Sequence, residues 1–285
     1  MTTIQPVTHR SFSQIKSYLT CAKQYQLQRL VRVPEVPAWY LCGGSAVHAV
    51  AEAITITPSL DTDAITDLWI KAWEKEVTDL AERSGVPTDQ WRAAGRATKD
   101  KPNKEDGEWW IQEGHQMCLR YSGWLSSILE QGWQVFDDGR GPWVERGVNV
   151  TVGGAHTKMF LDALFVMPGG ELIVVDHKTG SRAPDAQQLR LYALGLDRAG
   201  QPRPSLGAYW MARTGELTAP TVLDDSMDVV LDDTFANVDE GIKAGRFPAH
   251  VSSMCSGCGV NRYCAAFGGA DAKDFDPIYS TDRKA

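Results

Sequence analysis

The stretch from Phe160 to Tyr192 decides the predicted fold, and it reads FLDALFVMPGGELIVVDHKTGSRAPDAQQLRLY. Two apolar runs, Met159 to Val166 and Leu172 to Val175, are joined by a turn that contains one proline and two glycines. Apolar runs joined by such a turn predict a β-hairpin. Pro184 then opens a predicted helix, because proline is favoured at the first helical position.

Charged residues lie in both strands of this hairpin. Asp162 lies near the start of the first strand, and the second strand ends in Asp176-His177-Lys178. Ionisable groups at the end of a buried strand are costly unless they meet a metal ion or a substrate. Asp162 and Asp176 can converge on one divalent cation, and strand alternation puts Lys178 on the same face as Asp176. A lysine there could activate a water or neutralise charge on a phosphate, which predicts a metal-dependent phosphodiesterase site.

The helix after the hairpin holds Gln188 and Tyr192 four residues apart, and therefore on one face. This order of residues resembles the PD-(D/E)xK nuclease superfamily, and most closely its RecB-like branch, which has Asp, then Asp-x-Lys-Thr-Gly, then Gln-Leu-x-x-Tyr. The matching residues are Asp162, Asp176, Lys178, Thr179, Gly180, Gln188, Leu189 and Tyr192. Where the branch usually has glycine two residues before its first aspartate, this chain has Phe160.

A second helix is predicted from Gly43-Gly44-Ser45 to about Ile56, and it carries His48 and Glu52 one turn apart. For an isolated histidine, a hydrogen-bonded core residue is the ordinary interpretation. The RecB-like branch, however, has a Gly-x-x-x-His-x-x-x-Glu helix, which Gly44, His48 and Glu52 match in spacing. The resemblance implies that His48 binds the metal and that Glu52 orients His48 or lies near the ion.

The resemblance also assigns roles to the remaining motif residues. It implies that Mg²⁺ or Mn²⁺ is held by His48, Asp162, Asp176 and the backbone carbonyl of His177. Lys178 would position or deprotonate the attacking water, and Gln188 and Tyr192 would orient the water and the scissile phosphate. Glu145 lies on an expected strand from Trp143 to Val152. Related nucleases often use a glutamate here to support the site, but an exposed strand residue is the favoured interpretation.

The chain has six cysteines, at positions Cys21, Cys42, Cys118, Cys255, Cys258 and Cys264. The N-terminus lacks the apolar core of a secretory signal, so metal binding is a better interpretation than disulfides. The Cys-x2-Cys-x5-Cys segment from Cys255 to Cys264 needs a fourth thiolate to complete a site. Cys21, expected inside a helix from Ser11 to Leu30, can supply it, and Cys42 and Cys118 compete with it.

The spacing of the cysteines does not separate zinc from an iron–sulfur cluster. A subset of RecB-like nucleases, including AddB-type subunits and the CRISPR-adaptation nuclease Cas-four, has one cysteine upstream of the catalytic motifs and three downstream. The resemblance implies that Cys21, Cys255, Cys258 and Cys264 hold a [4Fe–4S] cluster that joins the N- and C-terminal segments. Such a cross-link closes a loop over most of the chain and should stabilise the fold by several kcal/mol, roughly as a long-loop disulfide does.

The resemblance implies an α/β fold with a PD-(D/E)xK (restriction-endonuclease-like) core, in which a central mixed sheet is flanked by helices. The 285 residues, 43% of them hydrophobic, are expected to form one nuclease domain. Its predicted parts are N-terminal helices (11–57), a helical insertion (58–131), a catalytic sheet core (132–224), and a C-terminal helix with the cysteine loop (225–268), followed by a tail from Lys273. Tryptophans at helical spacing in the insertion are expected to be core residues.

Charge bears on the expected partner, which is DNA. The net charge of −7 excludes a broad basic DNA-coating surface, although metals and a local groove can still attract DNA. Residues Arg92 to Lys104 are rich in lysine and arginine, and they form either a solvated loop or a flap that touches the nucleic-acid backbone. No apolar run is long enough to span a bilayer, and a cytoplasmic location is expected.

Two functions from different classes follow. The first is a metal-dependent exonuclease that acts on single-stranded DNA ends in phage or bacterial recombination, repair or CRISPR adaptation. The second is a DNA-end-binding adaptor that acts only within a complex. Recombination, helicase or integrase proteins, or further copies of the chain, are the partners that the resemblance suggests.

Overall fold

The computed structural model describes residues 7–95 and 104–279. The chain divides into two compact units. The central unit consists of Pro37–Val148 and Met159–Asp228, and the terminal unit consists of Met1–Val36, Asn149–Lys158 and Val229–Ala285. Two strands, β2 (Val144–Val152) and β3 (Ala155–Val166), contribute residues to both units.

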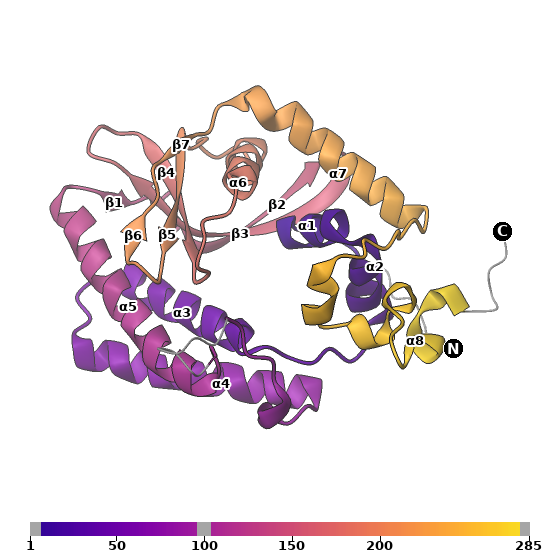
Figure 1. Ribbon diagram of the computed structural model, residues 1–285. Helices are drawn as coiled ribbons and strands as arrows, with labels where there is room; N and C mark the ends of the chain where they lie inside the picture. Colours follow the sequence, from indigo (N-terminus) through magenta and orange to yellow (C-terminus); the bar gives the residue numbers. More distant parts are fainter. Residues whose placement is uncertain (1–6, 96–103, 280–285) are drawn as a thin grey trace. The chain divides into compact units, whose positions relative to one another are not determined.

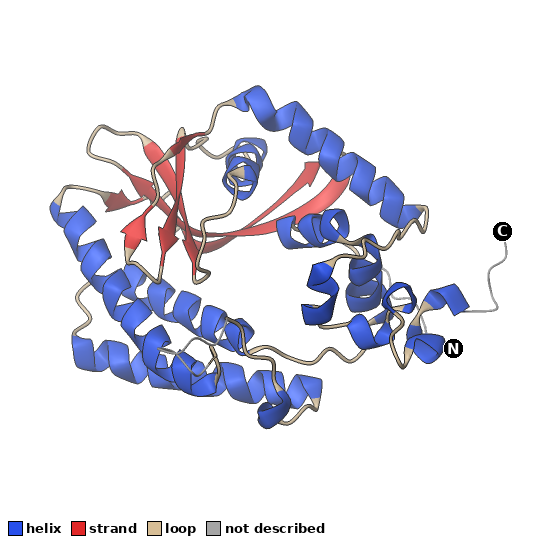
Figure 2. Cartoon of the chain, in the orientation of Figure 1, coloured by secondary structure: helices blue, strands red, loops and turns tan. Residues whose placement is uncertain are grey.

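A single mixed sheet of seven strands is the framework of the described residues (Figures 1 and 2). Besides β2 and β3, its strands are β1 (Gln134–Val135), β4 (Leu172–Lys178), β5 (Leu206–Met211), β6 (Glu216–Leu217) and β7 (Thr221–Val222). The order is β1-β3-β4-β5-β6, with β2 paired to β3 and β7 paired to β5. The antiparallel β3–β4 pair is the predicted hairpin. Since β4 and β5 are parallel, they need a crossover, which α6 (Gln187–Arg198) supplies. The α/β prediction is confirmed.

Helices cover both faces of this sheet (Figure 1). One face packs against α3 (Trp39–Ile56) and α5 (Gly107–Glu130), on which α4 (Thr62–Ser84) packs in turn, and the other face packs against α6. Trp69 and Trp110 are buried in the core on the first side, as predicted for tryptophans at helical spacing, and Trp210 of β5 is buried in the same core. The side chains of Val175 and Trp210 also face this core, so successive residues of β4 and β5 alternate between the two helical layers.

Two helix starts differ from the predictions. Helix α3 begins at Trp39, so Gly43 lies inside the helix and does not open it. A Cβ atom at Gly43 would lie 2.0 Å from the ring of Trp110, so glycine is needed for the close packing of α3 on α5. Helix α6 begins at Gln187, whose N–H donates to Asp185 Oδ1 at 3.1 Å. The start of α6 is therefore set by this side-chain acceptor and not by Pro184.

The terminal unit is built from helices and tight turns. Its helices are α1 (Phe12–Thr20), α2 (Ala22–Tyr25), a π-helical segment (Gln26–Val31), α7 (Asp228–Lys243) and α8 (Ala272–Phe275). Its 3₁₀ turns are Ser253–Gly257, Asn261–Tyr263, Ala265–Phe267 and Pro277–Tyr279. The central unit has two more such turns, Thr88–Gln90 and Asp225–Met227. Leu27, Val31, Val33 and Val260 form a small core in the terminal unit.

Two predictions for the terminal unit are wrong in detail. The single helix expected over Ser11–Leu30 is broken at Cys21, whose extended backbone (φ −160°) ends α1 and precedes α2. The expected C-terminal tail includes ordered structure, because Asp276 is buried and pairs with Lys23 at 3.0 Å. No helix among residues 7–95 and 104–279 is both long enough and apolar enough to cross a membrane.

Candidate active site

Two neighbouring strands bring the acidic residues of the hairpin together. Ala163 of β3 pairs with Val175 of β4, and Asp162 and Asp176 are the next residues on the two strands. The backbone N–H of His177 donates to Asp162 Oδ2 at 2.5 Å. This bond fixes the orientation of the Asp162 carboxylate, because one of its oxygens is held by the backbone of the adjacent strand.

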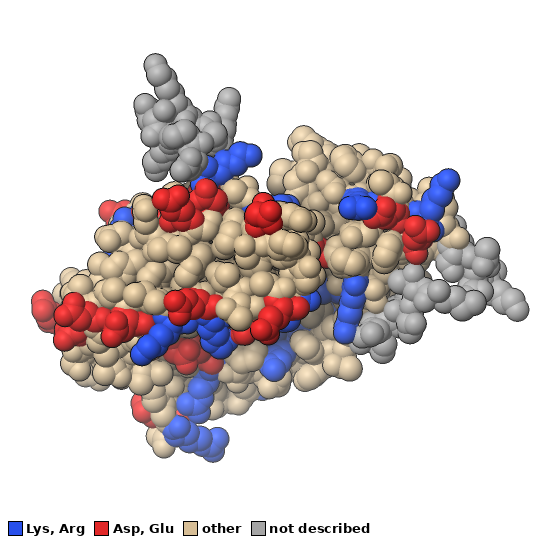
Figure 3. Space-filling view, turned by 90° about the horizontal axis from the view of Figure 1, so that it is seen from below, with Lys and Arg blue, Asp and Glu red and all other residues tan. Residues whose placement is uncertain are grey.

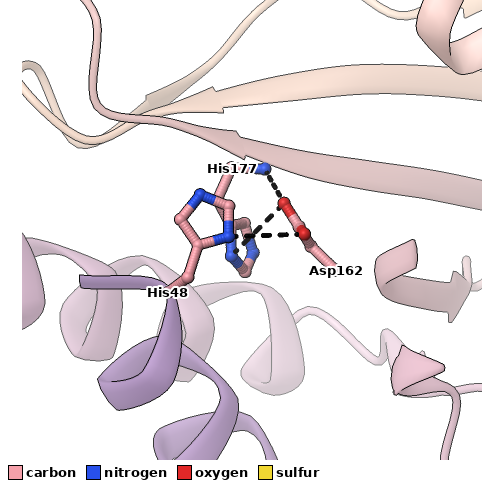
Figure 4. Close-up of side chains that lie close together, drawn as sticks. All are labelled: His48, Asp162 and His177. Carbon is pink, nitrogen blue, oxygen red and sulfur yellow. Dashed lines mark hydrogen bonds and ion pairs between the residues drawn. The ribbon is translucent and has the colours of Figure 1, made fainter. Parts of the chain in front are cut away.

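His48 reaches the same carboxylate from helix α3. Its Nδ1 lies 3.4 Å from Asp162 Oδ1 (Figure 4). The same atom lies 3.6 Å from Glu145 Oε1. A Cβ atom at Gly44, one turn before His48, would lie 3.4 Å from Thr179 Oγ1, so α3 passes close to the end of β4. Residues far apart in the sequence therefore meet at one point, as the motif order predicts.

The second acidic residue belongs to a closed ring of hydrogen bonds. Lys178 Nζ lies 2.5 Å from Asp176 Oδ2 and donates to Gln188 Oε1 at 3.0 Å. Gln188 Nε2 donates to the Tyr192 hydroxyl at 2.7 Å, and that hydroxyl donates to Asp176 Oδ1 at 3.1 Å. This series of contacts begins and ends at the carboxylate of Asp176, so each of the four side chains restricts the position of the next.

Burial and mutual charge determine the protonation of these groups. Burial would lower the pKa of His48, but Asp162 and then Glu145 and Asp176 outweigh it and hold this pKa well above its usual value. Burial would raise the pKa of Asp162, but the charge of His48 holds it below its usual value. Burial, assisted by the charge of Asp162, raises the pKa of Asp176 to about 6. The pKa of each of these groups depends on the charges of its neighbours, so His48, Asp162 and Asp176 share one electrostatic environment.

The donor set suits a divalent cation. Among the described residues, one group of His, Cys, Asp and Glu side chains offers ligand atoms that all lie within 4.8 Å of one another, and it consists of His48, Asp162 and His177. Asp176 is not in this group, since Lys178 and Tyr192 engage its carboxylate. Buried carboxylates and imidazoles packed this closely need a counter-charge, which a divalent ion would provide.

Glu145 lies close to the site, although the sequence favoured an exposed strand residue at this position. It lies on β2 beside His48 and has a backbone φ of 46°, which is rare for a residue with a side chain. Burial raises the pKa of Glu52, and the charge of Glu145 adds to this rise. The strained backbone at Glu145 could not be recognised from sequence alternation alone.

Phe160, which stands where the family pattern has glycine, does not disrupt the hairpin. Strand β3 is continuous through this position, and the ring of Phe160 is half exposed. A Cβ atom at Gly147 of β2 would lie 3.1 Å from the ring. The glycine that related nucleases have at position 160 is therefore matched here by a glycine on the neighbouring strand.

All four cysteines of the predicted cluster lie in the terminal unit, and each is partly exposed. The N–H groups of His250 and Ser252 donate to the sulfurs of Cys21 and Cys255, both at 3.4 Å. Burial raises the pKa of Cys258, and Cys21 and Cys255 add to the rise. Burial also raises the pKa of Cys264, to which Asp276 and Cys21 contribute.

These four cysteines do not form a closed metal site among the described residues. The one group of His, Cys, Asp and Glu side chains there that is close enough to hold an ion contains no cysteine. The competing cysteines lie elsewhere, in the core of the central unit. Burial raises the pKa of Cys42 to about 12 and raises that of Cys118 strongly, which keeps both as thiols.

On the face of the molecule shown in Figure 3, lysine and arginine side chains stand among aspartate and glutamate side chains. Of the predicted basic flap, residues 96–103 lie outside the described residues. Arg92, at its start, is tied to the central unit, since its N–H donates to Pro37 O at 2.8 Å.

Comparison with known proteins gives one family and several relatives. The sequence model of the PD-(D/E)XK nuclease superfamily matches residues 9–265. The gene 69 protein of Mycobacterium phage D29 is 29% identical over 90% of this chain and 97% of its own length. The gene 69 protein of Mycobacterium phage L5 is 27% identical over 90% and 96%. A solved structure from Eubacterium rectale, named "Putative exonuclease", is 13% identical, with a TM-score of 0.45 over 88% of this chain and 87% of that chain.

Proposed function

Because this chain belongs to the PD-(D/E)XK nuclease superfamily, we propose that it is a metal-dependent exonuclease that hydrolyses phosphodiester bonds at DNA ends, with single-stranded ends preferred. The observation that carries the proposal is the meeting of His48, Asp162, Asp176 and Lys178 where the end of β4 lies beside the interior of β3. An ammonium group beside two carboxylates and an imidazole is suited to phosphate chemistry.

Some residues of the site would bind the ion, and the others would orient the substrate. His48, Asp162, Asp176 and the backbone carbonyl of His177 would hold Mg²⁺ or Mn²⁺. When bound, the ion would polarise the phosphate and make a nearby water more acidic. The same ion would compete with the proton that the carboxylates now favour on His48, so its binding should release protons.

Lys178 supplies the second electrostatic element. Asp176 and Gln188 hold its Nζ, so the ammonium group has little freedom to move away. It would position the attacking water or stabilise the charge that develops on the phosphate oxygens. Tyr192 keeps its proton, because burial and then the charge of Asp176 raise its pKa well above the usual value. It would therefore orient neighbouring groups as a hydrogen-bond donor.

The test is a cleavage assay on end-labelled DNA. Linear single-stranded, linear duplex and circular single-stranded substrates are incubated with Mn²⁺, with Mg²⁺ and with EDTA. The proposal expects metal-dependent release of short products from linear single strands and none from circles. Asp162→Asn should reduce the rate by about 10³-fold, because it removes a charged ligand without changing the size of the side chain.

The assay also separates the two functions that the sequence suggested. DNA ends bound without any metal-dependent product would favour the end-binding adaptor. Cleavage of circles at the same rate as linear strands would retain the nuclease but contradict the exonuclease. The closed ring of Asp176, Lys178, Gln188 and Tyr192 supports the enzyme, since an adaptor needs no such arrangement.

We further propose that Cys21, Cys255, Cys258 and Cys264 hold a [4Fe–4S] cluster. Two backbone N–H groups directed at cysteine sulfurs support this, because hydrogen bonds to sulfur are common around such clusters. Purification without oxygen should give a brown protein containing about four irons per chain. A colourless protein with one zinc per chain would replace the cluster with a zinc site.

A further inference from the structure

The imidazole of His177 is a buried polar group with no evident structural partner. It is 2% exposed, and neither ring nitrogen has a hydrogen-bond partner among the described residues. The ring packs edge-on against Tyr121 (4.7 Å between centroids) and Trp210 (5.9 Å). Buried polar atoms without partners are costly and point to an ion, a water or a ligand that the isolated chain does not supply.

The position of the ring explains why the motif does not reveal it. His177 lies between Asp176 and Lys178 on β4, and strand alternation directs its side chain to the opposite face, toward α5. His48 arrives from α3 on that same side of the sheet, and the two imidazole centroids are 5.6 Å apart. The ring of His177 is therefore near the site although it is not on the face that carries Lys178.

The distances allow one ion to contact all three side chains. His177 Nδ1 lies 3.9 Å from Asp162 Oδ2, and His48 Nδ1 lies 3.4 Å from Asp162 Oδ1 (Figure 4). Two ligands bound at about 2.1 Å to one ion can be at most about 4.2 Å apart. Both measured separations fall within that limit, and the ligand atoms of all three side chains lie within 4.8 Å of one another, so one ion needs only a small movement of the rings to bind all three.

The surroundings of the ring also suit a ligand. Tyr121 and Trp210 restrict the ring on two sides, and neither of its nitrogens has a hydrogen-bond partner among the described residues.

We propose that the ring of His177 is a ligand of the catalytic ion and that His48, Asp162 and His177 together make the centre select Mn²⁺ over Mg²⁺. This rests on the proposed function, since it concerns the ion of the same site. Mg²⁺ prefers oxygen ligands and gives up its waters reluctantly, whereas transition-metal ions accept imidazole readily. A second imidazole, added to that of His48 and to the oxygen ligands already proposed, therefore disfavours Mg²⁺ relative to Mn²⁺.

The test measures metal binding without DNA, so it does not depend on cleavage. Isothermal titration of the whole protein with Mn²⁺ and with Mg²⁺ is compared between the wild type and His177→Phe, which keeps an aromatic ring and removes both nitrogens. The wild type should bind Mn²⁺ about 100-fold more tightly than Mg²⁺, and the variant should lose about 10-fold or more for Mn²⁺ with little change for Mg²⁺. Tyr121→Phe, which alters the same aromatic wall but no ligand, should retain the wild-type ratio.

A spectroscopic readout covers the case in which the variant does not fold. Electron spin-echo spectra of Mn²⁺ bound to the wild type should show nitrogen coupling from two imidazoles. Coupling from a single imidazole, or an unchanged Mn²⁺ to Mg²⁺ ratio in folded His177→Phe, would overturn the inference. Metal-dependent DNA cleavage alongside that result would leave the proposed nuclease intact, whereas a wild type that neither binds ions nor cleaves DNA would remove both.

Discussion

The metal group of the central unit and the cysteine group of the terminal unit are built in different ways. His48, Asp162 and His177 project from regular elements, α3, β3 and β4, and two of the three are buried. The cysteines lie at a helix break and in short 3₁₀ turns, and all are partly exposed. Secondary structure and core packing position the first group before any ion binds. We expect the second group to depend on a few tertiary contacts and on the proposed cluster.

The largest expected effect comes from removing the ammonium group or the carboxylate of the hydrogen-bonded ring. Lys178→Ala and Asp176→Ala should each reduce cleavage by at least about 10³-fold, because both act on charge at the reacting phosphate. Iron content and visible absorbance should stay unchanged, since the cysteines lie in the other unit. Initial rates with Mn²⁺ and iron analysis of the same preparations provide the measurement.

Lys71→Ala is the matched control for this experiment, because Lys71 is an exposed lysine on α4. It should cleave DNA at the wild-type rate. Full activity in Lys178→Ala would remove the assignment of this lysine. Loss of iron in either active-site variant would show that the two groups are coupled, contrary to the comparison above.

Removal of one cluster cysteine should produce the next largest effect, and it should act on stability. Cys21→Ser would open the cross-link to Cys255, and the free energy of unfolding should fall by about 3–5 kcal/mol, as for loss of a long-loop cross-link. Cys42→Ser is the matched control, since Cys42 is buried in the other unit. Anaerobic denaturant titrations with iron analysis should show iron loss in Cys21→Ser and full iron in Cys42→Ser. The reverse result would exchange the two cysteines in the site.

A smaller effect on stability is expected from an ion pair that stabilises the terminal unit without a metal. Lys23 Nζ donates to Asp276 Oδ1 at 3.0 Å and to Gln26 Oε1 at 2.7 Å, and Asp276 Oδ2 accepts the N–H of Ala265, next to Cys264. The pair thus links α2, which follows Cys21, to the turn that follows Cys264. Asp276→Asn should reduce the free energy of unfolding by about 2–3 kcal/mol, because it leaves a buried ammonium without a counter-charge.

The same variant tests how the cysteines are positioned. Asp276→Asn should lose its visible absorbance faster in air than the wild type, because Cys21 and Cys264 would be held less firmly. Lys23→Met combined with Asp276→Asn should recover part of the stability, since no buried charge is left unpaired. An unchanged rate of bleaching in a destabilised Asp276→Asn would limit this ion pair to a role in folding.

The contrast between the two groups also explains which features the sequence revealed. The hairpin and the shared face of Asp176 and Lys178 follow from local rules, a turn and a strand period of two. The helix break at Cys21 could not be predicted from the sequence, because the helical spacing of apolar residues continues through it. Only tertiary contacts favour the extended backbone there. The same alternation places the ring of His177 on the face opposite Asp176 and Lys178, and the sequence assigned only its backbone carbonyl to the site. The structure shows the ring beside Tyr121 of α5 and 3.9 Å from Asp162.

Glu145 provides the smallest expected effect and separates backbone strain from charge. Its φ of 46° costs about 1 kcal/mol for a residue with a Cβ atom, and its carboxylate lies beside His48. Glu145→Ala and Glu145→Gly both remove the carboxylate, so Mn²⁺ affinity should fall by the same modest factor, about 3- to 10-fold, in each. Only the glycine variant relieves the backbone, and it should be about 1 kcal/mol more stable than the alanine variant in denaturant titrations. Equal stability of the two variants would show that the backbone at position 145 carries no strain. Unchanged Mn²⁺ affinity in both would return Glu145 to the exposed strand residue that the sequence favoured.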